Sequence, residues 1–144
     1  MRSLLDVNVL VALFDQDHTF NDRAHLWFEA NKREGWASCP ITENGLVRIL
    51  TNPHYSAKIR YSAEWVIESL QEFCNASNHH FLPDQTTLRD KQIFATDRIL
   101  GSRQITDLYL LSLAASNGCR LVTFDRSITL GAVKTARPKN LALI

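Results

Sequence analysis

The sequence predicts the α/β fold class, with a short parallel β-sheet in the centre and helices flanking it. Two observations predict this class. Short apolar segments without polar alternation, typical of strands buried on both faces of a sheet, recur along the chain, and segments with helical periodicity separate them. The chain has 144 residues, 45% of them hydrophobic and 22% charged, and no linker, repeat or low-complexity segment divides it. We therefore expect a single domain over residues 1–144.

The first half of the chain is expected to alternate strands and helices. Its elements, in order, are a strand over 2–6, a buried helix over 7–14, an amphipathic helix over 20–32, a strand over 36–39 closed by Pro40, and a helix capped by Thr42 and stopped by Asn52-Pro53.

The second half is expected to continue this alternation. Its elements are a helix over 62–75, a short strand over 81–82, helices over 88–100 and 106–117, and strands over 120–124 and 141–144. In a parallel sheet covered on both faces, ligands bind beyond the carboxyl ends of the strands. Any chemistry is therefore expected at that edge.

Four of the fifteen acidic residues fall where strands end or helices begin: Asp6, Glu43, Asp107 and Asp125. Each alone has an ordinary structural explanation, as a helix cap, a partner of a helix dipole or the start of a turn. Together, several carboxylates at one partly buried edge repel one another unless they are protonated or hold a cation. Oxygen ligands of this kind, with Asn8 close by, suit Mg²⁺ or Mn²⁺.

The segments around these acids resemble the four acidic motifs of PIN-domain ribonucleases, and the layout is similar to VapC toxins of bacterial type II toxin–antitoxin pairs. The segments are Asp6-Val7-Asn8, Thr42–Gly45, Ile105–Ala114 and Leu121–Arg126. By position, the resemblance implies four catalytic, metal-binding acids and two supporting residues: Asp6, Glu43, Asp107 and Asp125, with Asn8 and Thr123.

The resemblance also implies a PIN-like fold, Mg²⁺-dependent endonucleolytic cleavage of RNA, homodimers and a cognate antitoxin that covers the active-site groove. The chemistry of the acids favours the same reaction. A metal would orient a water molecule and polarise the phosphate while a carboxylate accepts the proton, leaving 5′-phosphate and 3′-hydroxyl ends. Whether one or two metal ions act is left open.

Basic residues without acidic neighbours follow Glu43. Arg48, Lys58 and Arg60 are candidate contacts to RNA phosphates, and the interleaved tyrosines could stack on unpaired bases. The alternative is an ordinary solvated connection with half-buried tyrosines. Arg126, next to Asp125, is a further phosphate candidate at the metal edge.

Composition excludes several other classes of protein. With 16 basic and 15 acidic residues and a net charge of +1, the chain is neither disordered nor a polybasic binder of nucleic acid. The N-terminal apolar run is far shorter than the roughly 20 residues needed to span a bilayer, so we expect a cytoplasmic protein without a membrane anchor. The three cysteines are widely spaced and expected to be reduced, and no second ligand pair accompanies His79-His80 and Cys74 to favour zinc.

Two other functions stay open on the sequence alone. A phosphoaspartate switch would also cluster acids at the sheet edge, but Asn8 stands where its second aspartate is needed and Lys134 follows no predicted strand. A noncatalytic RNA-binding module would keep the basic segment and would need no acidic cluster.

Overall fold

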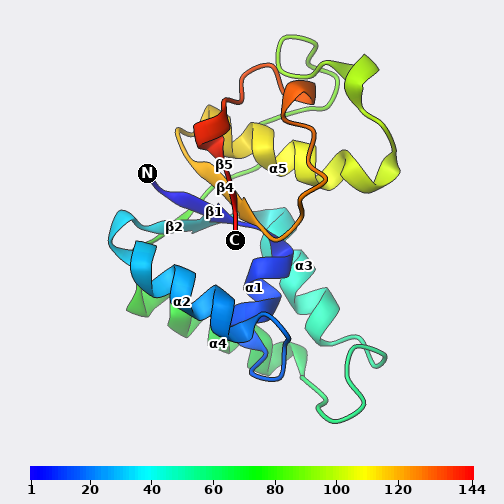
Figure 1. Ribbon diagram of the computed structural model, residues 1–144. Coiled ribbons are helices and arrows are strands. Elements are labelled where there is room, and N and C mark those ends of the chain that lie inside the picture. Colours follow the sequence, from blue (N-terminus) through cyan, green and yellow to red (C-terminus); the bar gives the residue numbers. More distant parts are fainter.

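A five-stranded parallel sheet forms the centre of the computed structural model, which describes residues 1–144 (Figure 1). The strands are β1 (Ser3–Leu5), β2 (Trp36–Ser38), β3 (His79–Phe81), β4 (Arg120–Thr123) and β5 (Leu141–Leu143), in the spatial order β3-β2-β1-β4-β5. Leu4 of the central strand β1 pairs with Ala37 on one side and with Leu121 on the other. The predicted α/β class is confirmed, and the strand expected over 81–82 lies slightly earlier.

Five helices flank the sheet: α1 (Val7–Phe14), α2 (Asn21–Asn31), α3 (Pro40–Leu50), α4 (Ala63–Ala76) and α5 (Ile105–Ser116). In Figure 1, α1 to α4 lie on one side of the sheet, and α5 lies on the other together with the loops around it. Single 3₁₀ turns occupy residues 32–34, 96–98, 102–104, 130–132 and 138–140. None of the helices combines the length and apolar character needed to cross a membrane.

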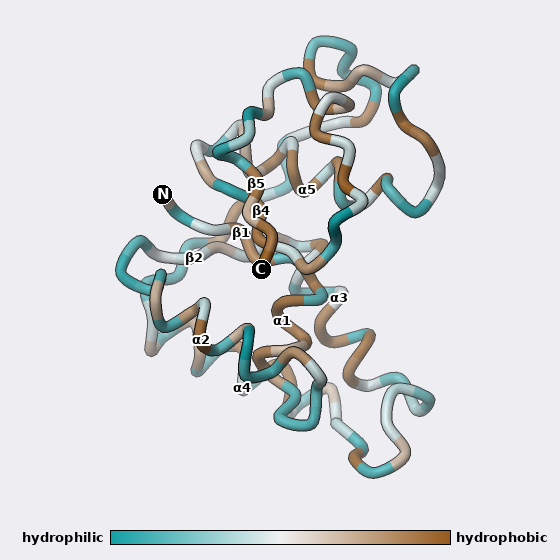
Figure 2. Tube along the Cα trace, viewed as in Figure 1, coloured by the Kyte–Doolittle hydropathy of each residue, from teal (hydrophilic) through white to brown (hydrophobic).

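Successive residues of the central strands divide the core into two parts. Leu4 and Leu121 belong to the core beneath α5, whereas their neighbours Leu5 and Val122 belong to the core beneath α1 to α4. This alternation follows from the two-residue repeat of a strand. Both faces are apolar, as the brown strands and inner helix faces of Figure 2 show. Polar side chains therefore gather at the ends of these strands rather than on the faces of the sheet.

The prediction of a helix over residues 88–100 is wrong. The structure has turns there and one 3₁₀ turn, Thr96–Arg98. Asp90 favours a turn because its carboxylate accepts a hydrogen bond from the Gln92 N–H at 2.8 Å. Phe94 is buried, forms an antiparallel bridge with Val133, and so draws the segment towards the C-terminal part of the chain. Tertiary packing here prevails over the apolar periodicity of the sequence.

Helix α3 begins earlier than predicted, and Thr42 is not its N-cap. Cys39 is the N-cap and Pro40 is the first helical residue, a position at which proline loses no helical hydrogen bond. The Thr42 hydroxyl accepts a hydrogen bond from the Cys39 N–H at 2.9 Å and donates one to the Cys39 carbonyl at 3.1 Å. Glu43 and Asn44 therefore lie in the first turns of α3, at the carboxyl edge of the sheet.

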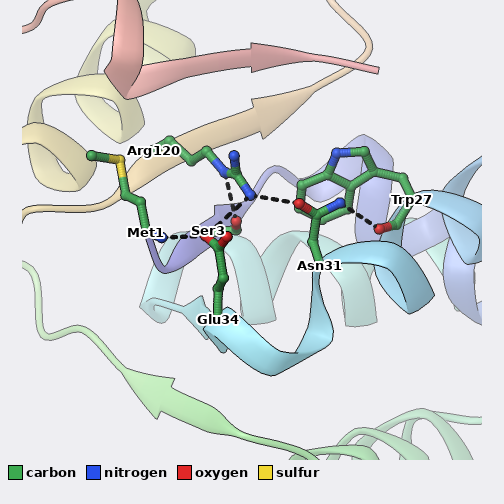
Figure 3. Close-up of polar contacts among 6 residues, drawn as sticks. All are labelled: Met1, Ser3, Trp27, Asn31, Glu34 and Arg120. Carbon is green, nitrogen blue, oxygen red and sulfur yellow. Dashed lines mark hydrogen bonds and ion pairs between the residues drawn. The ribbon is translucent and has the colours of Figure 1, made fainter.

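A polar cluster fixes the opposite, amino-terminal edge of β1 and β4 (Figure 3). The Arg120 guanidinium donates to the Ser3 hydroxyl at 3.0 Å and to the Asn31 side-chain oxygen at 2.8 Å. Glu34 lies 3.7 Å from the same guanidinium and pairs with the Met1 amino group. These contacts tie α2 and the 3₁₀ turn after it to the two central strands, far from the acidic edge.

Candidate active site

Asp6 lies at the junction of β1 and α1, where it caps the helix. One carboxylate oxygen accepts a hydrogen bond from the Val7 N–H at 2.6 Å, and the other accepts one from the Thr123 hydroxyl at 2.6 Å. The side chain of Asn8 donates to the same hydroxyl at 3.1 Å. Burial raises the pKa of Asp6, and these hydrogen bonds oppose the shift. Asp6 is thus a buried carboxylate held in one orientation by a fixed set of donors.

Thr123 also connects Asp6 to Asp125. Its hydroxyl oxygen accepts a hydrogen bond from the Asp125 N–H at 3.0 Å, directly after β4. The Asp125 carboxylate accepts from the Ser127 N–H at 2.7 Å, and this backbone hydrogen bond lowers the pKa of Asp125. Asp125 therefore stays ionised beside the other acids.

Asp107 brings a third carboxylate to the same place from the first turn of α5. Burial raises the pKa of Asp107 from 3.8 to about 6, and the charges of Asp6 and Asp125 add to the shift. A hydrogen bond with Asp125 favours the protonated form of Asp107 further. The three aspartates thus influence one another's ionisation and form one electrostatic unit.

The donor atoms of these three side chains are of the kind that a hard divalent cation prefers. The donors at the site are carboxylate, amide and hydroxyl oxygens, and no histidine or cysteine joins them. No group of three or more His, Cys, Asp or Glu side chains, these aspartates included, is arranged as a cage that could hold a metal ion. Mg²⁺ does not need such a cage, because it keeps several water ligands and binds through one or two carboxylates together with substrate phosphates. The mutual repulsion of the aspartates is the property that a bound cation would relieve.

A hollow of about 500 Å³, which we call the acidic hollow, opens in front of Asp6 and Asp107. Its walls come from the starts of α1 and α5 and from one side of α3. The residues that line it with the two aspartates are Val7, Asn8, Ile41, Asn44, Gly45, Arg48, Ile49 and Thr106. Arg48 supplies a positive charge opposite the acids. Asn44 and Thr106 are not among the site residues predicted from the sequence. The helical spacing of residues 41, 44 and 48 is the signal that places Asn44 on the same face of α3 as Arg48.

Gly45 allows α1 and α3 to approach closely beside this hollow. A Cβ atom at residue 45 would lie 2.7 Å from the Val7 Cγ2 atom and 2.9 Å from Cγ1. Since real carbon contacts of this kind are longer, only glycine fits between the helices. The wall of the hollow at this point is therefore backbone rather than side chain.

Comparison with known proteins agrees with this architecture. The family model described as the PIN domain matches residues 3–132. The chain belongs to the PIN-domain family.

Curated relatives place the chain among VapC-type PIN domains. It is similar to Ribonuclease VapC44 of Mycobacterium tuberculosis, with 41% identity over 144 residues and all of both chains covered. It is also similar to Ribonuclease VapC38 of the same species, with 41% identity over 146 residues and 99% of each chain covered. A crystal structure of VapBC2 from Rickettsia felis bound to a promoter DNA fragment matches with a TM-score of 0.58 and 18% identity, covering 100% of this chain and 98% of that one. That likeness shows the fold alone.

Glu43, the fourth predicted acid of this PIN domain, bonds to β2 and lines a second hollow. The Glu43 carboxylate accepts a hydrogen bond from the Ser38 hydroxyl at 2.5 Å and lines this second hollow with Cys74 and His79. Burial raises the pKa of the Cys74 thiol to about 11, and the charge of Glu43 adds to this shift. Electrostatic coupling thus links three of the four predicted acids, Asp6, Asp107 and Asp125, and the place of Glu43 in the metal site stays a prediction.

The predicted RNA-binding residues lie in different parts of the PIN domain. Arg48 lines the acidic hollow, and Arg126 is an exposed residue next to Asp125. Lys58 and Arg60 lie in the loop beyond the far end of α3, away from the sheet (Figure 1). The Arg60 guanidinium donates to the Pro53 carbonyl within this loop.

The two tyrosines of that loop are half-buried, as expected if the loop is an ordinary connection between helices rather than an RNA-binding segment. The Tyr55 and Tyr61 hydroxyls both donate to the buried carboxylate of Asp15, at 2.6 and 3.2 Å. They anchor the loop to the end of α1. The structure gives these rings a packing role.

Proposed function

We propose that this protein is a metal-dependent endoribonuclease and the toxin of a type II toxin–antitoxin pair. The observation that carries the proposal is the meeting of Asp6, Asp107 and Asp125 at one sheet edge, beside a hollow that also contains Arg48. Curated relatives that match the whole chain are named ribonucleases, and a VapBC structure shares the fold. Three carboxylates at one edge, with the Arg48 guanidinium nearby, suit an enzyme that cleaves a phosphodiester. A surface that only binds RNA would gain nothing from three carboxylates that repel one another.

Mg²⁺ is the proposed cofactor, and Mn²⁺ is an acceptable substitute with the same preference for oxygen ligands. The three aspartates would hold it, with Asn8 and Thr123 keeping Asp6 in place. When bound, the ion supplies Lewis acidity, which polarises a phosphate and lowers the pKa of an attached water molecule.

The protein's own residues would position the RNA and handle the proton. Arg48 and Arg126 would contact phosphates on either side of the scissile bond. One of the three carboxylates would accept the proton of the attacking water as a general base. Attack in line with the ribose 3′ oxygen then leaves a 5′-phosphate on one product and a 3′-hydroxyl on the other.

A cognate antitoxin is the proposed protein partner, and homodimers remain a prediction. The acidic hollow is a natural receptor for an arginine of the antitoxin, because a guanidinium offers paired donors to a carboxylate and neutralises the charge that a metal would otherwise balance. Such an arginine would block metal and RNA together.

Cleavage of a 5′-labelled single-stranded RNA pool by the purified protein tests the proposal. We expect the protein to cleave RNA when Mg²⁺ or Mn²⁺ is present and to stop when EDTA is added. The variant Asp6→Asn should not cleave RNA. Asp97→Asn, which removes an exposed carboxylate outside the hollow, is the matched control. RNA that binds but is not cut with any divalent ion would instead support the noncatalytic module.

A further inference from the structure

An aromatic cluster lies next to the acidic site, where the start of α2 meets the residue that follows β4. The ring centroids of Phe20 and Phe124 are 4.8 Å apart, and the ring planes are inclined by 35°. The Arg23 guanidinium carbon lies 5.9 Å from the Phe20 centroid and 6.0 Å from the Phe124 centroid. We call Phe20, Arg23 and Phe124 the aromatic platform.

Hydrogen bonds join the aromatic platform to the acidic site. Phe124 directly precedes Asp125 in the chain, and its N–H donates to the Asn8 side-chain oxygen at 3.5 Å. The Asn8 amide group donates to the Thr123 hydroxyl at 3.1 Å, and that hydroxyl donates to Asp6 at 2.6 Å. Asn8 also lines the acidic hollow. The platform therefore has a defined position relative to the proposed metal site.

The turn before α2 holds Phe20 in place. The Phe20 N–H donates to the His18 Nδ1 atom at 3.0 Å, and the His18 carbonyl accepts from the Asn21 N–H at 2.9 Å. The Asn21 side chain donates to the Ala12 carbonyl of α1 at 2.8 Å, which ties this turn to α1. Phe20 is thus presented by a turn whose backbone is anchored to a buried helix.

The aromatic platform is open to solvent. Phe124 packs against the core beneath α1 to α4, whereas Phe20 belongs to neither core and is 39% exposed. Arg23 is exposed and forms no ion pair with an acidic residue. Proteins that hold single-stranded RNA use this combination, because bases stack on aromatic rings and arginine contacts phosphates or stacks on bases.

We infer that the aromatic platform is a nucleotide subsite for the RNA substrate. An unpaired base stacks on the Phe20 ring, and the Arg23 guanidinium contacts a phosphate of the same nucleotide. The inference rests on the proposed ribonuclease function and adds to it a subsite that positions the strand on the Asp125 side of the cleaved bond.

A nucleotide is the ligand that matches both parts of the platform. Its base supplies an aromatic face for Phe20, and its phosphate supplies the negative charge that Arg23 lacks in the protein. Arg126, two residues after Phe124, is a second exposed cation on the same connection and can receive a neighbouring phosphate. The continuity with the acidic site favours an RNA strand over a protein partner, whose stacking side chain would bring no phosphate.

Stacking of this kind makes the subsite selective for unpaired nucleotides rather than for one base. Every base has an aromatic face, so any of the four can occupy the platform. A base within a double helix is already stacked on its neighbours and cannot cover Phe20. We therefore expect the protein to prefer single-stranded RNA at one position beside the cleaved bond.

Equilibrium binding of a short fluorescent single-stranded RNA in EDTA tests the inference without cleavage. Phe20→Ala should bind roughly 5- to 150-fold more weakly than the wild type, the effect of losing one stacked base. Phe20→Leu keeps apolar bulk against Phe124 and has no aromatic face, so it should also lose roughly 5-fold or more, whereas Phe20→Trp should keep the affinity. Arg23→Gln should reduce the log–log salt slope by roughly 0.7.

An abasic scan of the same RNA detects the stacked base itself. Each RNA of the scan lacks one base and keeps its phosphate. One abasic position should weaken binding to the wild type, and for that RNA Phe20→Leu should cause no further loss, because the base that the ring would hold is gone.

Trp65→Ala is the matched control. The Trp65 ring is 46% exposed and lies 5.1 Å from the Tyr61 ring, in a hollow that shares no residue with the acidic hollow. This variant should bind every RNA of the scan as the wild type does.

Two binding results would overturn the inference. Unchanged RNA affinity in Phe20→Ala would leave the platform to packing or to a protein partner, and a Phe20→Leu loss of equal size for every abasic RNA would mean that the ring acts only through the fold. Cleavage separates this inference from the proposed function. Phe20-dependent binding by a protein that cuts no RNA would sustain the inference alone, whereas cleavage with an unchanged KM in Phe20→Ala would sustain the function and overturn the inference.

Discussion

Replacing Asp107 with asparagine should stabilise the metal-free protein, although it removes a proposed metal ligand. The reason is electrostatic. Burial and the charges of Asp6 and Asp125 raise the pKa of Asp107 to about 6, so the folded protein disfavours the ionised carboxylate. Asparagine has a similar shape, carries no charge and can donate a hydrogen bond to Asp125.

The size of the effect follows from the pKa shift. A rise from 3.8 to about 6 corresponds to a ceiling of about 3 kcal/mol, at about 1.4 kcal/mol for each pH unit. Because Asp107 is only partly buried, screening by solvent reduces this to about 1–2 kcal/mol. The size of the effect depends on pH: the cost is absent at pH values below the ordinary pKa of 3.8, where the carboxyl is protonated in both states, grows between about pH 4 and pH 6, and is complete above about pH 6.

Thermal unfolding in EDTA at pH 8 and at pH 4 measures this effect. Asp107→Asn should raise the Tm by about 3–8 °C at pH 8 and leave it nearly unchanged at pH 4. Adding Mg²⁺ at pH 8 should stabilise the wild-type protein more than the variant. The exposed Asp97→Asn control should show neither difference. An equal gain at both pH values, or a loss at pH 8, would refute the proposed repulsion among the aspartates.

Three further substitutions test the surroundings of the site. Tyr55→Phe removes a hydrogen bond to the buried carboxylate of Asp15 and should cost about 1.5–3 kcal/mol in urea unfolding; no loss would mean that the loop is not anchored there. Gly45→Ala forces a methyl group against Val7 and should cost about 1–3 kcal/mol, and Val7→Ala in the same protein should recover most of it. Arg48→Ala should weaken RNA binding and reduce its log–log salt slope by roughly 0.7, and an unchanged slope would remove Arg48 from the phosphate contacts.

The general layout of the fold and most of the acidic edge could be predicted from the sequence. Asp6 and Asp125 end apolar strands and Asp107 opens a helix, so the rule that parallel strands present their carboxyl ends at one edge was enough to bring the three together. These predictions needed only the strand and helix boundaries.

Glu43 shows where that reasoning stops. Successive helical residues point about 100° apart, so a shift of one residue decides which hollow a side chain enters. The sequence placed the start of this helix at Thr42, whereas Cys39 is the cap. Acidic identity and the family resemblance pointed to Glu43, but the direction of its side chain depends on Ser38 and His79, the second of which lies on a strand far along the chain.

The prediction of a helix over residues 88–100 was wrong for a related reason. The apolar residues of this segment have helical spacing, yet the Ala95 N–H donates to the Ala132 carbonyl and Phe94 pairs with Val133 in an antiparallel bridge, which local sequence does not reveal. Long-range pairing of this kind overrides local propensity.

Binding of Mn²⁺ measured by electron paramagnetic resonance tests the central claim most directly, because it reports the metal site without RNA or cleavage. The wild-type protein should bind Mn²⁺ and release it to excess Mg²⁺. Asp6→Asn and Asp107→Asn should each weaken that binding by tenfold or more, since even the outer-shell partners of metal ligands contribute about 10- to 100-fold to affinity, while the exposed control Asp97→Asn should bind as the wild type does. Full Mn²⁺ affinity in both aspartate variants would contradict a metal site built from the three aspartates.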